Sequence, residues 1–306
     1  MSITLQATIG KTPLLLLKNI CSDCNVTILA KQESRNPMGS VKDRIALSMI
    51  EAGISDGQIK DNTTIIEATS GNTGLGLACV CAVKNMPLIL TMPESMSLER
   101  RALLKHLGAS LILTPAANGM QGAIDAAEEL LAKNSDYYMV RQFANPANPK
   151  VHEDTTAEEI WRDAKSTVDI FVAGIGTGGT FTGVMRRLKQ KNPAIQGVAV
   201  EPADSPVLSG GSPGPHKIQG IGAGFIPENL DRSLIDHVIT VSNDEAIQGA
   251  RLLAAKEGIL AGISSGAAIH AVLQLARKEE HSGKHIVTIL PDTGERYLST
   301  DLIQGM

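Results

Sequence analysis

A glycine-rich turn and a lysine far upstream of it have the residue types and spacing for cofactor chemistry. The turn comprises residues 176–180, Gly-Thr-Gly-Gly-Thr; it follows an apolar run at 168–175 that predicts a buried strand and precedes a predicted helix at 181–188. Glycines let the backbone approach a phosphate closely, and the N–H groups and positive dipole end of a helix then face its charge. The sequence therefore predicts a phosphate site at this turn.

Lys42 follows a turn at 36–39, and its neighbours Ser40 and Asp43 match the spacing of a capping box. We therefore expect Lys42 in the first turn of a helix. The positive end of the helix dipole disfavours an ammonium there by about 0.3–1 kcal/mol, which favours the neutral amine that a nucleophilic or Schiff-base lysine needs. The alternative, and the commoner case for a lysine taken alone, is a solvated side chain paired with Asp43.

Two further glycine-rich turns open predicted helices. Residues 69–74, TSGNTG, follow an apolar strand and bring hydroxyls, an amide and backbone N–H groups to a helix start, which predicts a receptor for a carboxylate or a phosphate. The alternative is a simple helix cap by Thr73. Residues 262–266, GISSG, are expected to join a strand to a helix, and taken alone they indicate a serine cap.

The composition is that of an ordinary soluble protein. The chain has 306 residues, 43% of them hydrophobic, so it can bury a large core in two domains or one large one. A net charge of −4 without a basic cluster argues against nucleic acid or an anionic membrane as a partner. No apolar run approaches the roughly 20 residues of a membrane helix, and the N-terminus lacks the pattern of a signal peptide. We predict a cytoplasmic protein without a membrane partner.

The four cysteines and seven histidines predict neither a disulfide framework nor a metal site. Cys79 and Cys81 lie in an Ala/Val-rich segment where cysteine usually acts as a small core residue. Cys21 and Cys24 form a lone C-x-x-C that could be redox-active or half of a zinc site, but no second pair completes a zinc site. We expect a loop with two thiols.

Short apolar strands alternate with amphipathic segments along most of the chain, which predicts an α/β fold with mainly parallel sheets. The expected strands are 26–31, 64–68, 87–91, 111–114, 138–142, 169–175, 197–201, 238–241 and 285–290. The Asn/Pro-rich stretch 145–149 breaks the pattern and is the best candidate for a domain crossing. Residues 202–224 are too rich in proline and glycine for a regular element.

A nicotinamide-dependent dehydrogenase is one alternative that these patterns leave open. Gly174, Gly176 and Gly179 satisfy G-x-G-x-x-G, and Glu201 ends the next strand, where a ribose-binding acid would stand. That reading leaves Lys42 and the turn at 69–74 without a role.

Taken together, the motifs resemble those of the fold-type II pyridoxal-phosphate enzymes (the tryptophan synthase β-like fold), most closely the cysteine synthases of the A type, or O-acetylserine sulfhydrylases. The stretches that carry the resemblance are TPL at 12–14, NP at 36–37, GSVKDR at 39–44, TSGNTG at 69–74, GTGGT at 176–180, GIGAGF at 220–225, GISSGA at 262–267 and PDTGERYLST at 291–300. They cover nearly the whole chain in fixed order.

The resemblance implies a role for each motif residue. Lys42 would bind the cofactor covalently and shuttle the substrate's α-proton, Asn72 would hydrogen-bond the cofactor's ring hydroxyl, and Ser264 would face its pyridine nitrogen. The phosphate would be held by Gly176, Thr177, Gly178, Gly179 and Thr180. The substrate would be bound by Thr69, Ser70, Asn72, Thr73, Gln142 and Gly220. Gln142 carries the weakest signal, because a glutamine that ends a strand is more often structural.

The resemblance also implies the reaction, the domains and the partners. The reaction would be β-replacement, in which sulfide displaces acetate from O-acetyl-L-serine to give L-cysteine, with pyridoxal 5'-phosphate as cofactor. The alternatives within the family are a cystathionine β-synthase-like enzyme and a thiosulfate-using enzyme of the B type. The domains would be 1–145 and 146–306, with 12–30 crossing onto the second. The partners would be a second copy in a homodimer and, in part of the family, the C-terminal peptide of serine acetyltransferase.

Overall fold

The structure, a computed structural model, describes residues 3–69 and 71–304. The chain forms two compact units: the first comprises Met1–Ile9 and Val41–Asn148, and the second comprises Gly10–Ser40 and Pro149–Met306. The chain therefore passes between the units three times, the last time inside the Asn/Pro-rich stretch at 145–149. The division into domains at residue 145 that the resemblance implies stays a prediction.

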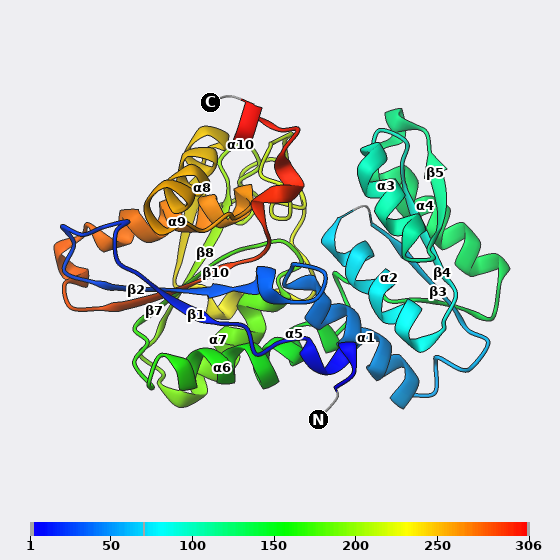
Figure 1. Cartoon of the computed structure of the whole chain (residues 1–306), viewed down its shortest axis with the longest axis horizontal. Helices are drawn as coiled ribbons and strands as arrows, with labels where there is room; N and C mark the ends of the chain where they lie inside the picture. The colour runs from blue at the N-terminus through cyan, green and yellow to red at the C-terminus, as the bar shows by residue number, and fades with distance from the viewer. Residues whose placement is uncertain (1–2, 70, 305–306) are drawn as a thin grey trace. The chain divides into compact units, whose positions relative to one another are not determined.

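The first unit is built on a four-stranded parallel sheet in the order β5-β4-β3-β6 (Figure 1). Its strands are β3 (Thr64–Ala68), β4 (Leu88–Pro93), β5 (Ser110–Thr114) and β6 (Tyr137–Met139). Its helices are α1 (Lys42–Ser55), α2 (Asn72–Lys84), α3 (Leu98–His106) and α4 (Gly119–Lys133). Because the strands are parallel, their carboxyl ends lie at one edge of the sheet, and the polar turns after β3 and β6 therefore lie at that same edge. A helix connects each strand to the next.

The second unit contains a six-stranded sheet in the order β1-β2-β10-β7-β8-β9, in which only β1 runs antiparallel to its neighbour. The strands are β1 (Leu14–Leu17), β2 (Thr27–Gln32), β7 (Ile170–Gly174), β8 (Gln196–Pro202), β9 (His237–Val241) and β10 (His285–Leu290). The helices are α5 (Ala147–Val151), a π-helix η4 (His152–Thr156), α6 (Ala157–Asp163), α7 (Gly179–Lys191), α8 (Asn243–Glu257), α9 (Ile263–Ala276) and α10 (Asp301–Gln304). The short 3-10 helices of this unit are η2 (Glu33–Arg35), η5 (Arg232–Leu234), η6 (Glu279–His281) and η7 (Gly294–Tyr297), whereas η1 (Leu5–Thr8) and η3 (Ala116–Asn118) belong to the first unit.

Both faces of this second sheet are buried. On β7, Ile170 and Val172 join the core under α8 and α9, whereas Phe171 and Ala173 join the core under α7 and α6. A strand covered on both faces has no polar face, which explains why the sequence shows continuous apolar runs here rather than alternation. The apolar packing fixes the ends of the strands, and the glycine turns follow those ends.

The expected α/β fold with mainly parallel sheets is confirmed, and all nine expected strands are present, two with the expected bounds (64–68 and 285–290) and seven with shifted ends. The edge strand β1 was not expected, because four consecutive leucines carry no period. No regular strand or α-helix forms between Pro202 and His237, in line with the proline and glycine content of 202–224. No described helix is long and apolar enough to cross a membrane.

Three local predictions are wrong. Helix α1 begins at Lys42 without a side-chain cap, because Ser40 lies outside the helix in a bridge with Asp292 and so no capping box forms. The turn at 262–266 follows α8 and a single bridge at Ala261 rather than a strand.

The third correction concerns the cysteines. Cys21 and Cys24 are joined in a disulfide, not left as two thiols. Their loop is held in place because Glu257 accepts hydrogen bonds from the N–H groups of Asn19 and Ile20 at 2.6 and 2.8 Å. Cys79 and Cys81 are buried free thiols in α2, as expected.

Candidate active site

The turn at 176–180 forms a backbone cradle at the N-terminus of α7. Gly178 adopts φ +80°, and no side chain among the described residues caps the first turn of α7. A Cβ atom on Gly176 would lie 2.2 Å from the carbonyl oxygen of Gly220, and one on Gly178 would lie 2.8 Å from the Cβ of Leu230. Only glycine therefore fits at either position. The turn presents N–H groups and a helix dipole to an anion, which fits a phosphate.

His152 joins this turn from the π-helix that precedes α6. Its Nε2 lies 3.2 Å from Thr180 Oγ1 and its Nδ1 lies 2.9 Å from Thr156 Oγ1, and the ring is buried. The approach is close because α7 carries Gly183, where a Cβ would lie 2.1 Å from the carbonyl oxygen of Pro149. His152 thereby orients the hydroxyl of Thr180. His152 is not predictable from the sequence, because 28 residues separate it from Thr180; a π-helix is a frequent mark of functional sites but leaves no signature in sequence.

Ser264 and Gly220 lie together in the same unit. Ser264 is a buried residue in the first turn of α9, which begins after Gly262 without a side-chain cap, so the serine-cap alternative is wrong. Gly220 has φ +95°, and a Cβ built on it would have Ser264 Oγ at 3.9 Å as its nearest neighbour. Because the carbonyl of Gly220 also packs against Gly176, the second unit brings Gly176, Gly220 and Ser264 together.

The first unit brings Lys42 and the turn at 69–74 together through the packing of α1 on α2. Lys42 is the first residue of α1 and is half-buried, while Asp43 is buried, so neither residue is fully solvated. Asn72 is the first residue of α2. A Cβ on Gly76 would lie 3.0 Å from both the Lys42 carbonyl oxygen and the Ala46 Cβ, so a glycine lets the two helices approach at the end that carries Lys42.

The turn at 69–74 also contacts Gln142. Thr73 Oγ1 donates a hydrogen bond of 2.6 Å to Gln142 Oε1, and both side chains are buried. Helix α2 has no side-chain cap, so the alternative of a simple cap by Thr73 is wrong. Thr69 is buried, and its Oγ1 accepts from the N–H of Gly71 at 3.4 Å. Ser70 lies outside the described residues. The first unit thus holds Lys42, Thr69, Asn72, Thr73 and Gln142.

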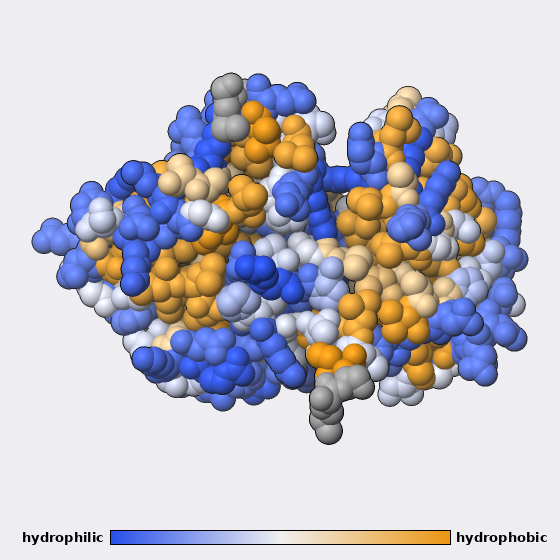
Figure 2. All heavy atoms as spheres, in the orientation of Figure 1, coloured by the Kyte–Doolittle hydropathy of each residue, from blue (hydrophilic) through white to orange (hydrophobic). Residues whose placement is uncertain are grey.

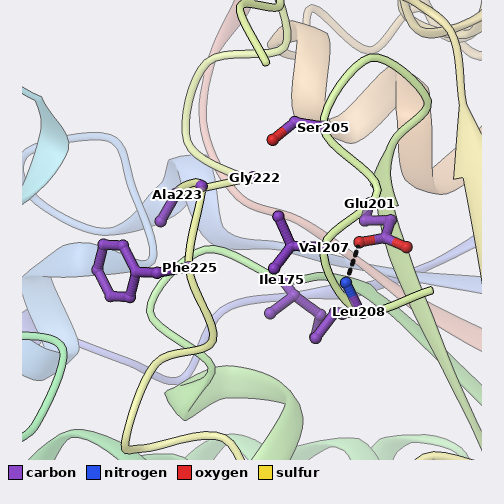
Figure 3. A pocket seen from close by; sticks show the side chains of 9 residues that line it. Ile175, Glu201, Ser205, Val207, Leu208, Gly222, Ala223 and Phe225 are labelled. Carbon is purple, nitrogen blue, oxygen red and sulfur yellow. Dashed lines mark hydrogen bonds between the residues drawn. The ribbon is translucent and has the colours of Figure 1, made fainter. Parts of the chain in front are cut away.

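Glu201 does not serve as the ribose-binding acid of a dehydrogenase. Its carboxylate is buried and accepts a hydrogen bond from the N–H of Leu208 at 2.7 Å (Figure 3). It also accepts hydrogen bonds from the N–H and hydroxyl of Ser209 at 2.9 and 2.6 Å. These bonds hold the loop that follows β8. Because both carboxylate oxygens are engaged inside the protein, the G-x-G-x-x-G pattern has no acidic partner here.

Each unit holds residues whose chemistry suits a part of pyridoxal phosphate. The second unit offers a phosphate cradle whose backbone requires glycine at positions 176 and 178, and it places a buried hydroxyl near that cradle. The first unit offers a lysine at the start of a helix, next to a turn rich in hydroxyl and amide groups. A phosphate site, a hydroxyl for a ring nitrogen and an amine for a Schiff base are what pyridoxal phosphate requires of a protein.

Comparisons with known proteins agree with this donor set. The family described as pyridoxal-phosphate dependent enzyme matches residues 5–292. The chain is 55% identical to a cysteine synthase from Staphylococcus aureus (strain Mu50 / ATCC 700699) over 295 residues, which are 96% of this chain and 94% of that protein.

Solved structures show the same relationship. A cysteine synthase from Entamoeba histolytica superimposes with a TM-score of 0.97 at 44% identity, covering 99% of this chain and 90% of that one. An O-acetylserine dependent cystathionine beta-synthase from Helicobacter pylori superimposes with a TM-score of 0.90 at 45% identity, covering 98% and 99%. Since the family match spans nearly the whole chain and the site residues fit the cofactor, this chain belongs to the pyridoxal-phosphate dependent enzymes.

Proposed function

We propose that this enzyme is a cysteine synthase, which replaces the acetate of O-acetyl-L-serine by sulfide to give L-cysteine. The observation that carries the proposal is the 55% identity to a cysteine synthase over 96% of the chain. The buried donor groups described above support it, because each has the chemistry that one part of this reaction needs.

The second unit binds the cofactor's phosphate and ring nitrogen. Gly176, Thr177, Gly178, Gly179 and Thr180 would hold the phosphate, with the Thr180 hydroxyl oriented by His152. When bound, pyridoxal phosphate supplies an electron sink that stabilises negative charge at the substrate's Cα. Ser264 would face the ring nitrogen; a neutral hydroxyl does not stabilise a protonated ring as an aspartate would, and this favours elimination over transamination.

The first unit binds the substrate and moves its proton. Lys42 Nζ would hold the cofactor, take the α-proton of the substrate and return a proton to the product, so one amine serves as tether, base and acid. Asn72 would donate to the cofactor's ring hydroxyl. Thr69, Ser70, Asn72 and Thr73, together with Gln142, would bind the substrate's α-carboxylate, and Gly220 of the second unit would also contact the substrate.

Steady-state assays test this function. O-acetylserine, phosphoserine and serine are each assayed against sulfide, thiosulfate and homocysteine. We expect the highest kcat/KM with O-acetylserine and sulfide, and a yellow protein whose colour is lost on borohydride reduction. The proposal would be contradicted if the protein were colourless and gained no colour from added pyridoxal phosphate. It would also be contradicted if the yellow protein formed no cysteine.

A second activity deserves assay because of one comparison. The similarity to an O-acetylserine dependent cystathionine beta-synthase, at 45% identity over 98% of the chain, makes homocysteine an alternative acceptor. A kcat/KM with homocysteine above that with sulfide would move the assignment to this activity. The same assay shows whether thiosulfate, the sulfur donor of the B-type enzymes, gives a higher kcat/KM than sulfide.

The partner expected from the resemblance is the C-terminal peptide of serine acetyltransferase. The hydroxyls and N–H groups of the turn at 69–74 would bind its terminal carboxylate as they bind that of the substrate. A peptide of about ten residues ending in isoleucine should inhibit competitively with O-acetylserine, and its C-terminal amide should bind far more weakly, since each charge-assisted bond contributes about 1.5–3 kcal/mol. Equal binding of acid and amide in titration calorimetry would exclude a shared site.

The proposed assembly is a homodimer, and the proposed location is the cytoplasm. Support for a dimer comes from leucines that the first unit leaves exposed. Leu98 and Leu103 on α3 and Leu113 on β5 are 73%, 52% and 43% exposed, and Figure 2 shows apolar surface gathered over these two elements. A second copy of the chain would cover them. The cytoplasmic location stays a prediction from the sequence.

A further inference from the structure

We propose that Glu67 is a positioning residue: its buried carboxylate holds the backbone of residues 141 and 142 in the conformation that directs the Gln142 side chain to Thr73. In this role Glu67 sets the affinity of the enzyme for the α-carboxylate of its substrate. The inference rests on the proposed function, because that function assigns Gln142 and Thr73 to the substrate.

Glu67 lies where two neighbouring strands part. It is the fourth residue of β3 and is only 3% exposed. Strand β6 pairs with β3 as far as Met139, and the N–H of Val140 still reaches the Ile66 carbonyl oxygen at 3.4 Å. After that point the backbone leaves the ladder and bonds to a side chain instead. The N–H of Arg141 donates to Glu67 Oε2 at 2.8 Å, and the N–H of Gln142 also bonds to this carboxylate.

The backbone that Glu67 holds is in an unfavourable conformation. Arg141 has φ +53°, in the left-handed region that L-residues other than glycine, asparagine and aspartate rarely adopt. Such a conformation persists when surrounding interactions fix it. The two N–H groups on either side of the Arg141 Cα both point to one carboxylate, so Glu67 supplies that interaction.

The position of this bend decides where Gln142 points. Gln142 is the next residue after the bend, and its Oε1 accepts the 2.6 Å hydrogen bond from Thr73 Oγ1. Its carbonyl oxygen accepts from Asn148 Nδ2 at 2.8 Å. Because these groups are buried, a shift of residue 142 leaves the Thr73 hydroxyl without this acceptor. A change at Glu67 therefore reaches the carboxylate-binding turn through Gln142, without touching the substrate.

The charges around Glu67 leave the two backbone N–H groups as its main partners. The charged groups that face Glu67 are Arg141, which follows β6, and Glu128 on α4. The side chains of these two residues pair with each other at 2.9 Å near the surface. Tyr138 on β6 is the further titratable group beside it, and Leu90 stands opposite on β4. Burial raises the pKa of Glu67 to about 7, against the effect of its backbone hydrogen bonds. The ionised form is the stronger acceptor, so the bend is held most firmly above that pH.

The first test is the substitution Glu67→Gln, which keeps the shape but removes the charge and one acceptor oxygen. We expect the KM for O-acetylserine to rise about tenfold, as the loss of one charge-assisted hydrogen bond predicts, with kcat changed less than about threefold. Glu128→Gln is the matched control: it breaks the surface pair with Arg141 but leaves the bend intact, and both constants should stay within about twofold. A fall in the kcat of Glu67→Gln without a rise in its KM would overturn the proposal.

The pH dependence of the KM gives a second test, which compares the native enzyme with Glu67→Gln. In the native enzyme the KM for O-acetylserine should fall as the pH rises through about 7, because ionised Glu67 holds the bend more firmly. In Glu67→Gln this component should be absent, so the ratio of the two KM values should grow with pH. A constant ratio between pH 5.5 and 8.5 would contradict the role of the carboxylate.

The third test measures the bend itself and does not depend on the reaction. Hydrogen exchange at the amides of residues 141 and 142 should be at least tenfold faster in Glu67→Gln than in the native protein or in Glu128→Gln. Adding Arg141→Gly to Glu67→Gln should lower the KM again by about threefold or more, since glycine adopts this φ without strain. Unchanged amide exchange would refute the proposal. A native enzyme that does not use O-acetylserine would refute only the proposed function and leave the exchange test valid.

Discussion

At the scale of single residues, placement rather than residue type distinguishes the functional groups. Lys42 is one of many cationic residues in the chain, but it stands at the start of α1, where the helix dipole favours a neutral amine. Glu67 is one of many acidic residues, but its carboxylate is buried and accepts a hydrogen bond from the backbone N–H of Arg141. Both positions alter the chemistry of an ordinary side chain.

Lys42→Ala should fold but lose catalysis. The tether and the proton-transferring amine disappear together, so we expect cysteine formation to fall by at least about 10²–10⁴-fold, the range for loss of a general acid-base group. The measurement is single-turnover formation of cysteine from O-acetylserine and sulfide. Lys105→Ala, at an exposed lysine of the same unit, should keep its activity. Near-normal turnover by Lys42→Ala would remove Lys42 from the mechanism.

Glu67 should make stability depend on pH. Its pKa is about 7 in the folded chain against an ordinary value of 4.5, so the folded state binds the proton more tightly. Its stabilising contribution is therefore complete below about pH 4.5 and is lost as the pH rises to about 7, at a cost of up to about 3 kcal/mol.

Glu67→Gln has no such titration, which gives the measurement. Between pH 5 and 8 the free energy of unfolding of the variant should rise relative to that of the native protein by up to about 3 kcal/mol. Urea unfolding of both proteins at each pH gives this difference, in which the titration of all other groups cancels. Parallel curves would show that Glu67 does not have a raised pKa in the folded state.

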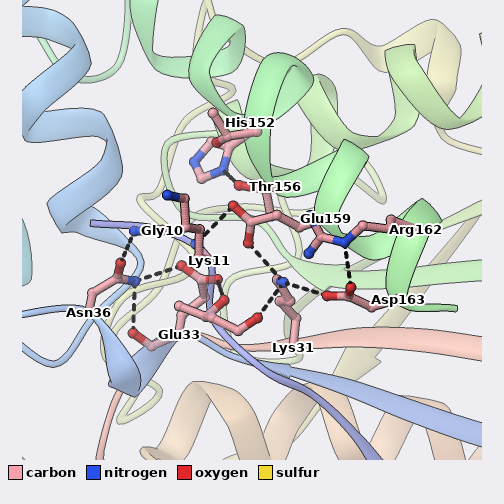
Figure 4. Close-up of polar contacts among 12 residues, drawn as sticks. Gly10, Lys11, Lys31, Glu33, Asn36, His152, Thr156, Glu159, Arg162 and Asp163 are labelled. Carbon is pink, nitrogen blue, oxygen red and sulfur yellow. Dashed lines mark hydrogen bonds and ion pairs between the residues drawn. The ribbon is translucent and has the colours of Figure 1, made fainter. Parts of the chain in front are cut away.

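At the scale of elements, glycines let helices pack closely and so bring together the helix ends and segments that carry the candidate site residues. Gly76 lets α2 approach the first turn of α1, and Gly183 lets α7 approach the segment that carries His152. In the second unit, a buried polar cluster joins β2, α6 and the segment at 10–12. Lys31 Nζ lies 2.8 Å from Glu159 Oε2 and 2.6 Å from the Thr12 carbonyl oxygen (Figure 4).

Gly76→Val should damage activity more than stability. Its Cβ would meet Ala46 and the Lys42 carbonyl at 3.0 Å, so the start of α1 must move relative to the turn at 69–74. We expect kcat/KM to fall about a hundredfold, the effect of a displacement near 1 Å, with about 1–3 kcal/mol of lost stability. Ala82→Val, at an exposed position of the same helix, is the control for helix propensity and should leave kcat/KM within about twofold. Equal kinetics in the two variants would contradict the packing argument.

Lys31→Met should destabilise the second unit. It leaves the buried carboxylate of Glu159 without its cation, a change that typically costs about 3–5 kcal/mol. Urea unfolding followed by the fluorescence of Trp161, the only tryptophan and a residue of α6, measures the effect. Arg162→Ala breaks only the exposed pair with Asp163 and should cost less than about 1 kcal/mol. Lys31→Met with Glu159→Leu should recover much of the loss; no recovery would show that the cation acts elsewhere.

At the scale of the whole molecule, the chain distributes its chemistry over two units. The first holds Lys42 and the turn proposed to bind the substrate carboxylate, and the second holds the turn proposed to bind the phosphate, together with Ser264. Each unit contains one mainly or wholly parallel sheet with its own helices, so each fixes its own set of groups. The exposed leucines on α3 and β5 leave the first unit with an apolar surface that a second copy of the chain would bury.

The proposed dimer can be tested by its mass. Light scattering of the native protein at micromolar concentration should give about twice the chain mass of 32.3 kDa. Replacing Leu98 and Leu103 together by Glu places two charges in the proposed interface, and the double variant should be a monomer. Leu260→Glu is the control, because Leu260 is a similarly exposed leucine of the second unit. If the Leu98 and Leu103 double variant stays dimeric, the surface over α3 and β5 is not the interface.

The sequence by itself determined the α/β class, the phosphate turn and the motif positions. Buried parallel strands appear as continuous apolar runs, and turns that approach a ligand or another backbone need glycine, so both leave a local pattern. Gly176 and Gly178 show this directly, since a Cβ at either position would clash. The start of α1 at Lys42 was also predictable, although the capping box was not formed.

Only the tertiary structure decided the groups that act across long separations. His152 meets Thr180 across 28 residues, Glu67 holds the bend at Arg141 across 74, and Thr73 meets Gln142 across 69. A buried carboxylate on a strand has no local signature, because its neighbours in sequence are not its partners in space. Two local features were not predicted for other reasons: the four leucines of β1 carry no period, and the C-x-x-C spacing of Cys21 and Cys24 does not by itself decide between two thiols and a disulfide. Local sequence specifies which backbone shapes are possible, whereas the burial and pairing of a side chain depend on where the sheets bring distant segments together.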